Sequence, residues 1–238
     1  LQWRMNMPIK IALLADLHYS TLGNMLIPER KNECAMFFLK RAVEYFRITG
    51  APDLFIIAGD CVDAPSKEES FAHLKEISDY MAKAPAPSII IPGNHDPAPE
   101  EFYRIIPKPP EYMDIKGMRF VPFPYDPERP GYNAFRENNA LKLMEKSADG
   151  FSGRIAAIQH VPLNPPGCDD VTSPCNYENA EEVVSAMKKC GYSLCISGHW
   201  HKGDNQYEKD GITYITAPAL CETPFRTLII TVGDDGKI

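Results

Sequence analysis

Features that would direct a protein to a membrane or a secretory route are missing from this 238-residue chain. No apolar run approaches the roughly 18 residues that a membrane span requires. The apolar run at 9–15 is too short for a signal peptide and leads directly into Asp16. We therefore expect residues 1–7 to be a peripheral leader, and the protein to be cytoplasmic and to have no membrane partner.

The chain also lacks the cysteine spacing of common metal and redox motifs. Its seven cysteines include no close Cys-x-x-Cys pair, which argues against a zinc ribbon and against a thioredoxin-like site. Without a secretory signal, reduced thiols are expected. Cys168 and Cys175 would pair only in an oxidising compartment.

Basic clusters are scarce as well. The net charge is −7, and the densest basic positions are the pairs Arg30-Lys31 and Lys188-Lys189. A protein that contacts nucleic-acid phosphates usually presents a basic face, so nucleic acid is disfavoured as a partner without being excluded. The sequence has no internal repeat, and its length suits a single domain covering residues 1–238.

Short apolar runs alternate with longer amphipathic stretches along most of the chain. Runs rich in isoleucine and bounded by turn residues predict strands at 9–15, 54–58, 88–92, 118–122, 154–159 and 193–197. Helical periodicity predicts helices at 31–49, 67–83, 137–147 and 178–190. The alternation of strands and helices at the start predicts parallel strands joined by right-handed crossovers.

The C-terminal part has a different pattern. Asp210-Gly211 separates 205–209 from 212–216, which is a strong hairpin signal, and 227–232 is a final strand rich in β-branched residues. This end of the chain is expected to be antiparallel. The whole sequence therefore predicts an α/β fold with mixed sheets.

The most informative feature is the position of the polar residues. Five apolar runs are each followed by candidate metal ligands, in the segments Asp16-Leu17-His18, Gly59-Asp60, Gly93-Asn94-His95-Asp96, His160 and Gly198-His199-Trp200-His201. Ligands gather at the carboxyl ends of strands in open α/β sheets, so these side chains should converge. Carboxylate oxygen, amide oxygen and imidazole nitrogen suit manganese, iron and zinc without any thiolate.

The spacing within these segments supports a shared site. Asp16 and His18 are two residues apart and would face the same side of an extended chain, as would His199 and His201. A glycine also occurs where the backbone would have to turn closely past the site, at positions 59, 93 and 198.

Each segment has an ordinary explanation when it is taken alone. Asp-x-His or Gly-Asp after a strand is more often a hydrogen-bonded turn, and a lone His160 would more often be a satisfied core histidine. Five such segments in this order are much harder to attribute to turns. Of the six histidines, only His73 lies elsewhere, and we expect it on the solvated face of the helix predicted at 67–83.

Taken as a set, the segments resemble the motifs of the calcineurin-like metallophosphoesterase family. The family pattern is D-x-H, G-D-x-x-D, G-N-H-[DE], a single His and G-H-x-H, and Asp63 completes the second motif. The match runs from residue 16 to residue 201, and the part around His160 is the least typical. The resemblance implies an α/β sandwich in which two mixed β-sheets are flanked by helices.

The resemblance also implies two divalent metal ions, which would be manganese, iron, zinc or nickel. One ion would be bound by Asp16, His18 and His201, the other by Asn94, His160 and His199, and Asp60 would bridge both. A hydroxide that bridges the two ions would attack phosphorus in line, so no covalent intermediate is required.

Catalytic roles outside the ligand set follow from the same resemblance. His95 would face the substrate phosphate and give a proton or hydrogen bond to the leaving oxygen, and Asp96 would orient His95. Asp63 would have a supporting or structural role. Cys61 is expected to point away from the site, so we do not expect it to act as a nucleophile.

The implied reaction is hydrolysis of a phosphodiester or phosphomonoester, with a nucleotide-like small molecule as the first candidate. A nuclease of the same family is an alternative that would need a basic groove. A non-catalytic scaffold with this fold is a third hypothesis, but such relatives typically lose metal ligands, and here the set is complete.

Specificity would come from loops around the site. Stretches rich in proline at 97–111, 124–133 and 161–176 are expected to be ordered surface loops, and the first segments to consider for substrate contact are 19–30, 97–111, 124–136 and 161–176. Candidate substrate contacts are Tyr19, Asn133, Arg136 and Asn164, and for each of them a structural role is the simpler expectation.

Overall fold

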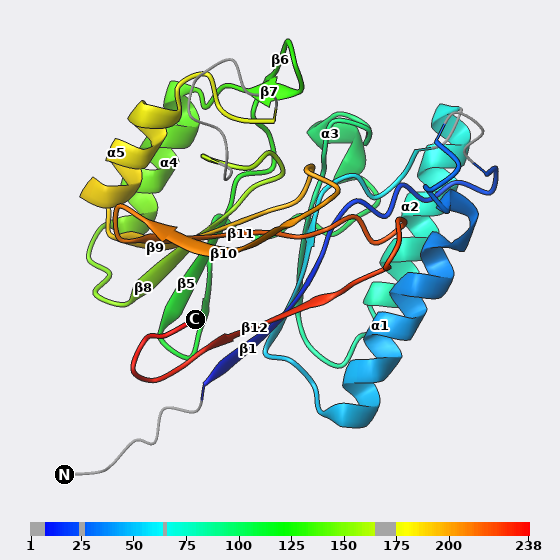
Figure 1. Ribbon diagram of the computed structural model, residues 1–238, viewed down its shortest axis with the longest axis horizontal. Coiled ribbons are helices and arrows are strands. Elements are labelled where there is room, and N and C mark those ends of the chain that lie inside the picture. Colours follow the sequence, from blue (N-terminus) through cyan, green and yellow to red (C-terminus); the bar gives the residue numbers. More distant parts are fainter. Residues whose placement is uncertain (1–7, 24–26, 64–65, 165–174) are drawn as a thin grey trace.

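The computed structural model describes residues 8–23, 27–63, 66–164 and 175–238. The expected leader at 1–7 and Cys168, the candidate partner of Cys175, lie outside these residues. Two main sheets pack face to face, with helices on both outer sides, as Figure 1 shows. Within the described ranges, no helix combines the length and apolar character needed to span a bilayer.

The first sheet has the strand order β12-β1-β2-β3. Its strands are β1 (Ile9–Leu14), β2 (Leu54–Ala58), β3 (Ser88–Ile91) and β12 (Leu228–Val232). β1, β2 and β3 run parallel, as the sequence predicts, and β12 is antiparallel to β1. The segments between them form the short helix η1 (Asn32–Cys34) and the helices α1 (Ala35–Thr49) and α2 (Lys67–Met81).

The second sheet has the order β10-β11-β9-β8-β5-β4. Its strands are β4 (Met113–Ile115), β5 (Met118–Pro122), β8 (Arg154–Ile158), β9 (Tyr192–Ser197), β10 (Asp204–Lys209) and β11 (Ile212–Thr216). The four inner strands are parallel, and the edge strands β4 and β10 are antiparallel to their neighbours. The predicted hairpin is confirmed, because β10 and β11 flank Asp210 and Gly211. α4 (Asn138–Ala148) and α5 (Ala180–Lys189) lie over the outer face.

Alternation of side chains along β1 explains the layers. Ile11 and Leu13 point into the core between the two sheets, while Ala12 and Leu14 belong to the core under α1 and α2. A third core lies between the second sheet and helices α4 and α5. Because both faces of each sheet are covered, the strands read as nearly continuous apolar runs.

The loops contain short elements that the sequence did not predict. The stretch at 97–111 includes α3 (Pro99–Phe102), and 124–136 includes a hairpin of β6 (Glu128–Arg129) and β7 (Asn133–Ala134). Elements of two to four residues are too short to show a periodicity.

Two expectations about helices are corrected by the structure. The helix predicted at 178–190 begins only at Ala180. His73 is not solvated, since it is 7% exposed and its ring lies over Tyr19 with 4.2 Å between ring centroids. His73 shares its face of α2 with Leu74 and Ile77, which are buried against the first sheet.

Candidate metal centre

The carboxyl ends of β1, β2, β8 and β9 are linked to one another beyond the strands. The backbone N–H of Asp16 donates to the carbonyl of Gly59 at 3.0 Å, and that of Gly198 donates to the carbonyl of His160, also at 3.0 Å. The segments that follow these strands are therefore held side by side. Polar side chains that are distant in the sequence project from this edge.

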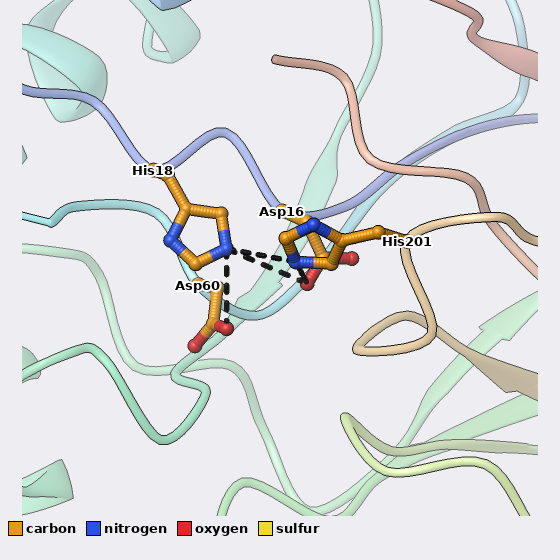
Figure 2. Close-up of side chains that lie close together, drawn as sticks. All are labelled: Asp16, His18, Asp60 and His201. Atoms are coloured by element: carbon orange, nitrogen blue, oxygen red, sulfur yellow. Dashed lines mark hydrogen bonds and ion pairs between the residues drawn. The ribbon is translucent and has the colours of Figure 1, made fainter. Parts of the chain in front are cut away.

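Asp16, His18, Asp60 and His201 form the first cluster, and Figure 2 shows their side chains turned toward one another. His18 Nε2 lies 3.1 Å from His201 Nε2 and 3.5 Å from Asp60 Oδ2. His201 Nε2 lies 3.6 Å from Asp16 Oδ1. One ligand atom from each of the four residues lies within 4.8 Å of the others.

Asp60, His160 and His199 form a second cluster, in which the ligand atoms again lie within 4.8 Å of one another. Asp60 therefore belongs to both clusters. His160 Nε2 is the centre of the second cluster. It lies 3.3 Å from Asp60 Oδ2, 3.1 Å from His199 Nδ1 and 3.1 Å from Asn94 Oδ1. All seven residues that the sequence singled out as candidate ligands thus lie at one site.

Hydrogen bonds on the far side of the imidazole rings fix their orientation. His160 Nδ1 donates to the carbonyl of Ala58 at 2.7 Å, and His199 Nε2 donates to the carbonyl of Tyr132 at 2.9 Å. The two remaining nitrogens face each other. Burial alone would lower the pKa of His160, but the charge of Asp60 and the hydrogen bond to it raise that pKa to about 10, so without a metal ion His160 Nε2 carries a proton. A metal cation beside Asp60 would replace that proton and would accept a lone pair from each ring.

A hydrogen bond fixes the orientation of a histidine ring in the first cluster as well. His201 Nδ1 donates to Glu222 Oε1 at 2.6 Å, which leaves the Nε2 lone pair directed at His18. His18 is fully buried, and its Nδ1 atom has no hydrogen-bond partner among the described residues. The donor set therefore fits a bound metal ion.

Burial and mutual charge perturb the ionisable groups strongly. Burial raises the pKa of Asp16 to about 6 and lowers that of His18 to about 3. Burial also lowers the pKa of His199 to about 4, with help from the charge of His160. Burial alone would raise the pKa of Asp60, but the charge and hydrogen bond of His160 hold it well below its ordinary value. Such clusters of perturbed groups are typical of functional sites.

Three glycines make room for the ligand side chains. A Cβ atom at Gly198 would lie 2.6 Å from the Cβ of Ala15 and 2.8 Å from Asp16 Oδ2. A Cβ atom at Gly59 would collide with the His160 ring, and one at Gly93 would collide with the Asp60 carboxylate. The close approach that the sequence predicts at these glycines is confirmed.

The backbone of several candidate ligands is strained. Asp16, His18, Asp60 and His199 all have positive φ angles, of 52°, 46°, 51° and 67°. Such left-handed conformations cost on the order of 1–3 kcal/mol each, and they cluster at sites where function requires a particular side-chain direction.

His95 lies at the open side of the first cluster, and its orientation corrects one expectation. Its Nδ1 atom is 3.2 Å from Asp63 Oδ1, so Asp63 and not Asp96 orients the ring. The Asp96 carboxylate instead accepts hydrogen bonds from the backbone N–H groups of Gly93 at 2.8 Å and of Cys61 and Val62 at 3.0 Å. Asp96 therefore fixes the loop that carries His95.

Two residues at the site carry no sequence signal. These residues are Glu222, which contacts His201, and Arg30. Arg30 lies between Glu222 and Asp63, with its Nε atom 3.3 Å from Glu222 Oε1 and its Nη1 atom 3.5 Å from Asp63 Oδ2. Neither belongs to a motif, and they are 192 positions apart in the chain. Only the folded arrangement shows that Glu222 supports a candidate ligand.

Two candidate substrate contacts have structural partners instead. The Tyr19 hydroxyl donates to Glu76 at 2.8 Å. The fully buried Arg136 binds both carboxylate oxygens of Asp126, at 3.0 and 2.6 Å. Cys61 is buried in the core under α1 and α2, as expected.

Asn133 and Asn164 also make local contacts. The Asn133 amide donates to the carbonyl of Pro130 and accepts from the backbone N–H of Asn176, both at 2.9 Å. The backbone N–H of Asn164 donates to the Asn176 side chain at 2.9 Å. These bonds tie the hairpin at 124–136 to the segment after β8.

The comparison with solved structures supports this fold. A dimetal phosphatase from Danio rerio is 16% identical with a TM-score of 0.75, over 96% of this chain and 94% of that chain. A putative 5'-nucleotidase from Staphylococcus aureus is 12% identical with a TM-score of 0.56, over 90% of this chain and 49% of that one. A 5'-nucleotidase from Candida albicans is 14% identical with a TM-score of 0.51, over 99% of this chain and 54% of that chain.

A comparison with curated protein sequences found no match. The family model described as calcineurin-like phosphoesterase matches residues 9–203, which include every motif given above. The sandwich of two mixed sheets flanked by helices agrees with that match. The chain therefore belongs to the calcineurin-like phosphoesterase family and is a metal-dependent phosphoric ester hydrolase.

Proposed function

We propose that this protein hydrolyses a small, nucleotide-like phosphate ester with the aid of two divalent metal ions. The observation that carries the proposal is the pair of facing nitrogens, His160 Nε2 and His199 Nδ1, at 3.1 Å. Because the other nitrogen of each ring donates to a backbone carbonyl, both rings can offer a lone pair to the same space once a metal ion replaces the proton on His160 Nε2. Nitrogen and carboxylate donors of this kind suit manganese, iron, zinc or nickel.

The ligand assignment follows from the two clusters. The first ion would be held by Asp16, His18, Asp60 and His201, and the second by Asp60, Asn94, His160 and His199. When bound, two such ions supply Lewis-acid activation of the phosphoryl group and of the attacking water.

Side chains outside the ligand set would handle the leaving group. The hydrogen bond to Asp63 raises the pKa of His95, so this ring keeps its proton more readily than an isolated histidine. In our proposal, His95 gives that proton to the departing oxygen. Arg30, beside Asp63, adds positive charge where the negatively charged phosphate would lie.

Small substrates are the first to test. The neighbours in structure include a phosphatase and 5'-nucleotidases, and the net charge of −7 disfavours a long polyanion such as DNA or RNA. A panel of nucleotides, sugar phosphates and bis-p-nitrophenyl phosphate, each assayed with manganese, iron, nickel and zinc, would cover both monoesters and diesters.

The Asp60→Ala variant is the sharpest test, because Asp60 belongs to both clusters. We expect the wild type to bind two ions per chain by elemental analysis, and the variant to lose both ions and its turnover. Asp79→Ala is the matched control, since Asp79 is an exposed helix residue paired with Lys75. Full turnover in Asp60→Ala, or no metal in the reconstituted wild type, would contradict the proposal.

A further inference from the structure

A pocket of about 220 Å³ opens beside the second cluster. Asn94, His160 and His199 contribute to its wall, so a phosphate at the metal centre would have its substituent at the mouth of this pocket. The inference below rests on the proposed function, because it concerns what the substrate carries beyond its phosphate.

Proline makes an unusually large share of the pocket wall. Pro92, Pro97 and Pro99 line one part of it, and Pro124 lines another. The fixed φ angle of proline leaves these segments few alternative conformations. A largely preformed pocket loses little conformational entropy when a ligand enters.

Aromatic side chains complete the pocket. Phe123 is buried, while Tyr125 and Tyr132 are 60% and 59% exposed. Large aromatic residues with so much free surface are suited to stacking against a flat ring, which costs them little conformational entropy. Tyr132 is also fixed to the centre itself, since its carbonyl accepts the hydrogen bond from His199.

The position of Phe123 is held from behind by Arg136. The Cζ atom of Arg136 lies 4.1 Å from the centroid of the Phe123 ring. The same guanidinium binds Asp126, another residue of the pocket wall. The wall is therefore supported by a buried ion pair.

We propose that this pocket binds a flat aromatic ring of the substrate, either a nucleobase or an aryl group, while the phosphate lies at the metal centre. The proline surfaces and exposed tyrosine rings of the pocket can recognise a π-face without requiring a particular pattern of hydrogen bonds. A sugar or alkyl phosphate would leave the same surfaces uncovered.

Three phosphate monoesters with similar alcohol leaving groups test this assignment in the metal-loaded protein: adenosine 5'-monophosphate, benzyl phosphate and ribose 5-phosphate. We expect kcat/KM for the two aromatic esters to exceed that for ribose 5-phosphate by about tenfold or more, which corresponds to one stacked ring. An advantage confined to the nucleotide points to a nucleobase, and an equal advantage for benzyl phosphate points to any aryl ring. No advantage for either ester would overturn the proposal.

The variant Tyr125→Ala should bring this ratio close to one, whereas Tyr125→Phe, which keeps the ring, should retain it. Tyr45→Ala is the matched control, because Tyr45 is half exposed on α1 and does not line the pocket. A ratio that is unaffected in Tyr125→Ala would contradict the assignment.

A binding measurement separates this inference from the proposed function. In metal-free wild-type protein, isothermal titration should show at least about tenfold tighter binding of adenosine 5'-monophosphate than of ribose 5-phosphate. If no ester is hydrolysed but this preference is found, the proposed function fails and the ring pocket stands. If hydrolysis occurs and no preference is found in either experiment, the ring pocket fails alone.

Discussion

The Nδ1 atom of His95 lies 3.2 Å from Oδ1 of Asp63, although the two residues are 32 positions apart. Their hydrogen bond raises the pKa of His95 and lowers that of Asp63, so each group stabilises the charged form of the other. His95 remains partly exposed to solvent. Asp63 is thus a positioning residue for His95.

The first prediction concerns this pair. Asp63→Asn should lower kcat by about tenfold for an alkyl phosphate, because a poor leaving group needs the proton that His95 holds. The loss should be smaller for p-nitrophenyl phosphate, whose leaving group departs without protonation. In a His95→Ala background, Asp63→Asn should add little, and fully additive losses in steady-state kcat would contradict the pairing.

The second prediction concerns Glu222, which holds the far nitrogen of His201. Glu222→Ala should weaken binding of one metal ion by about 10–100-fold, as is usual when the partner of a metal-bound histidine is removed. The second ion should be retained, because Glu222 contacts only the first cluster. Metal titration followed by calorimetry would resolve the two sites, and Glu208→Ala, at an exposed glutamate on β10, is the control.

A third prediction follows from the space around Gly198. Gly198→Ala should lower the free energy of unfolding by about 2 kcal/mol, since the new Cβ must displace Ala15 or Asp16. Gly150→Ala should cost roughly 1 kcal/mol, because it introduces only backbone strain at a φ of +65° with open space around it. Urea denaturation in the presence of a chelator measures both. A larger loss for Gly150→Ala would refute this account.

The fourth prediction concerns the buried pair of Arg136 and Asp126. Arg136→Met should destabilise the protein by about 3–5 kcal/mol, because it leaves the Asp126 carboxylate buried without a countercharge. The double variant Arg136→Met/Asp126→Leu should lose less than the single one. Arg47→Met, at an exposed arginine, should stay within about 0.5 kcal/mol in the same thermal and urea experiments.

The convergence of the candidate ligands could be predicted because it depends only on strand order and chain direction. Asp16 follows β1 and Asp60 follows β2, and those strands are parallel neighbours, so their carboxyl ends must meet. Short buried strands can be recognised in the sequence as apolar runs. The positions of the residues that follow these strands are therefore determined by the strand order of the sheet and do not depend on contacts of their own side chains.

Contacts that depend on side-chain direction could not be predicted in the same way. Asp63 and Asp96 are both acids near His95, and only the backbone N–H groups that surround Asp96 decide which of them is free to orient the ring. His73 was misplaced for a related reason. Its ring lies against Tyr19, from the loop after β1, and the sequence shows no pattern for this contact.

Tyr132 joins two parts of the molecule through a single residue, with its side chain lining the pocket and its carbonyl fixed to His199. A ligand that displaces the hairpin of β6 and β7 must therefore change the affinity of the second metal position. Thermodynamic reciprocity then requires the ion to change the affinity of the ligand by the same factor. Metal supply and substrate supply would act on this enzyme as mutual effectors.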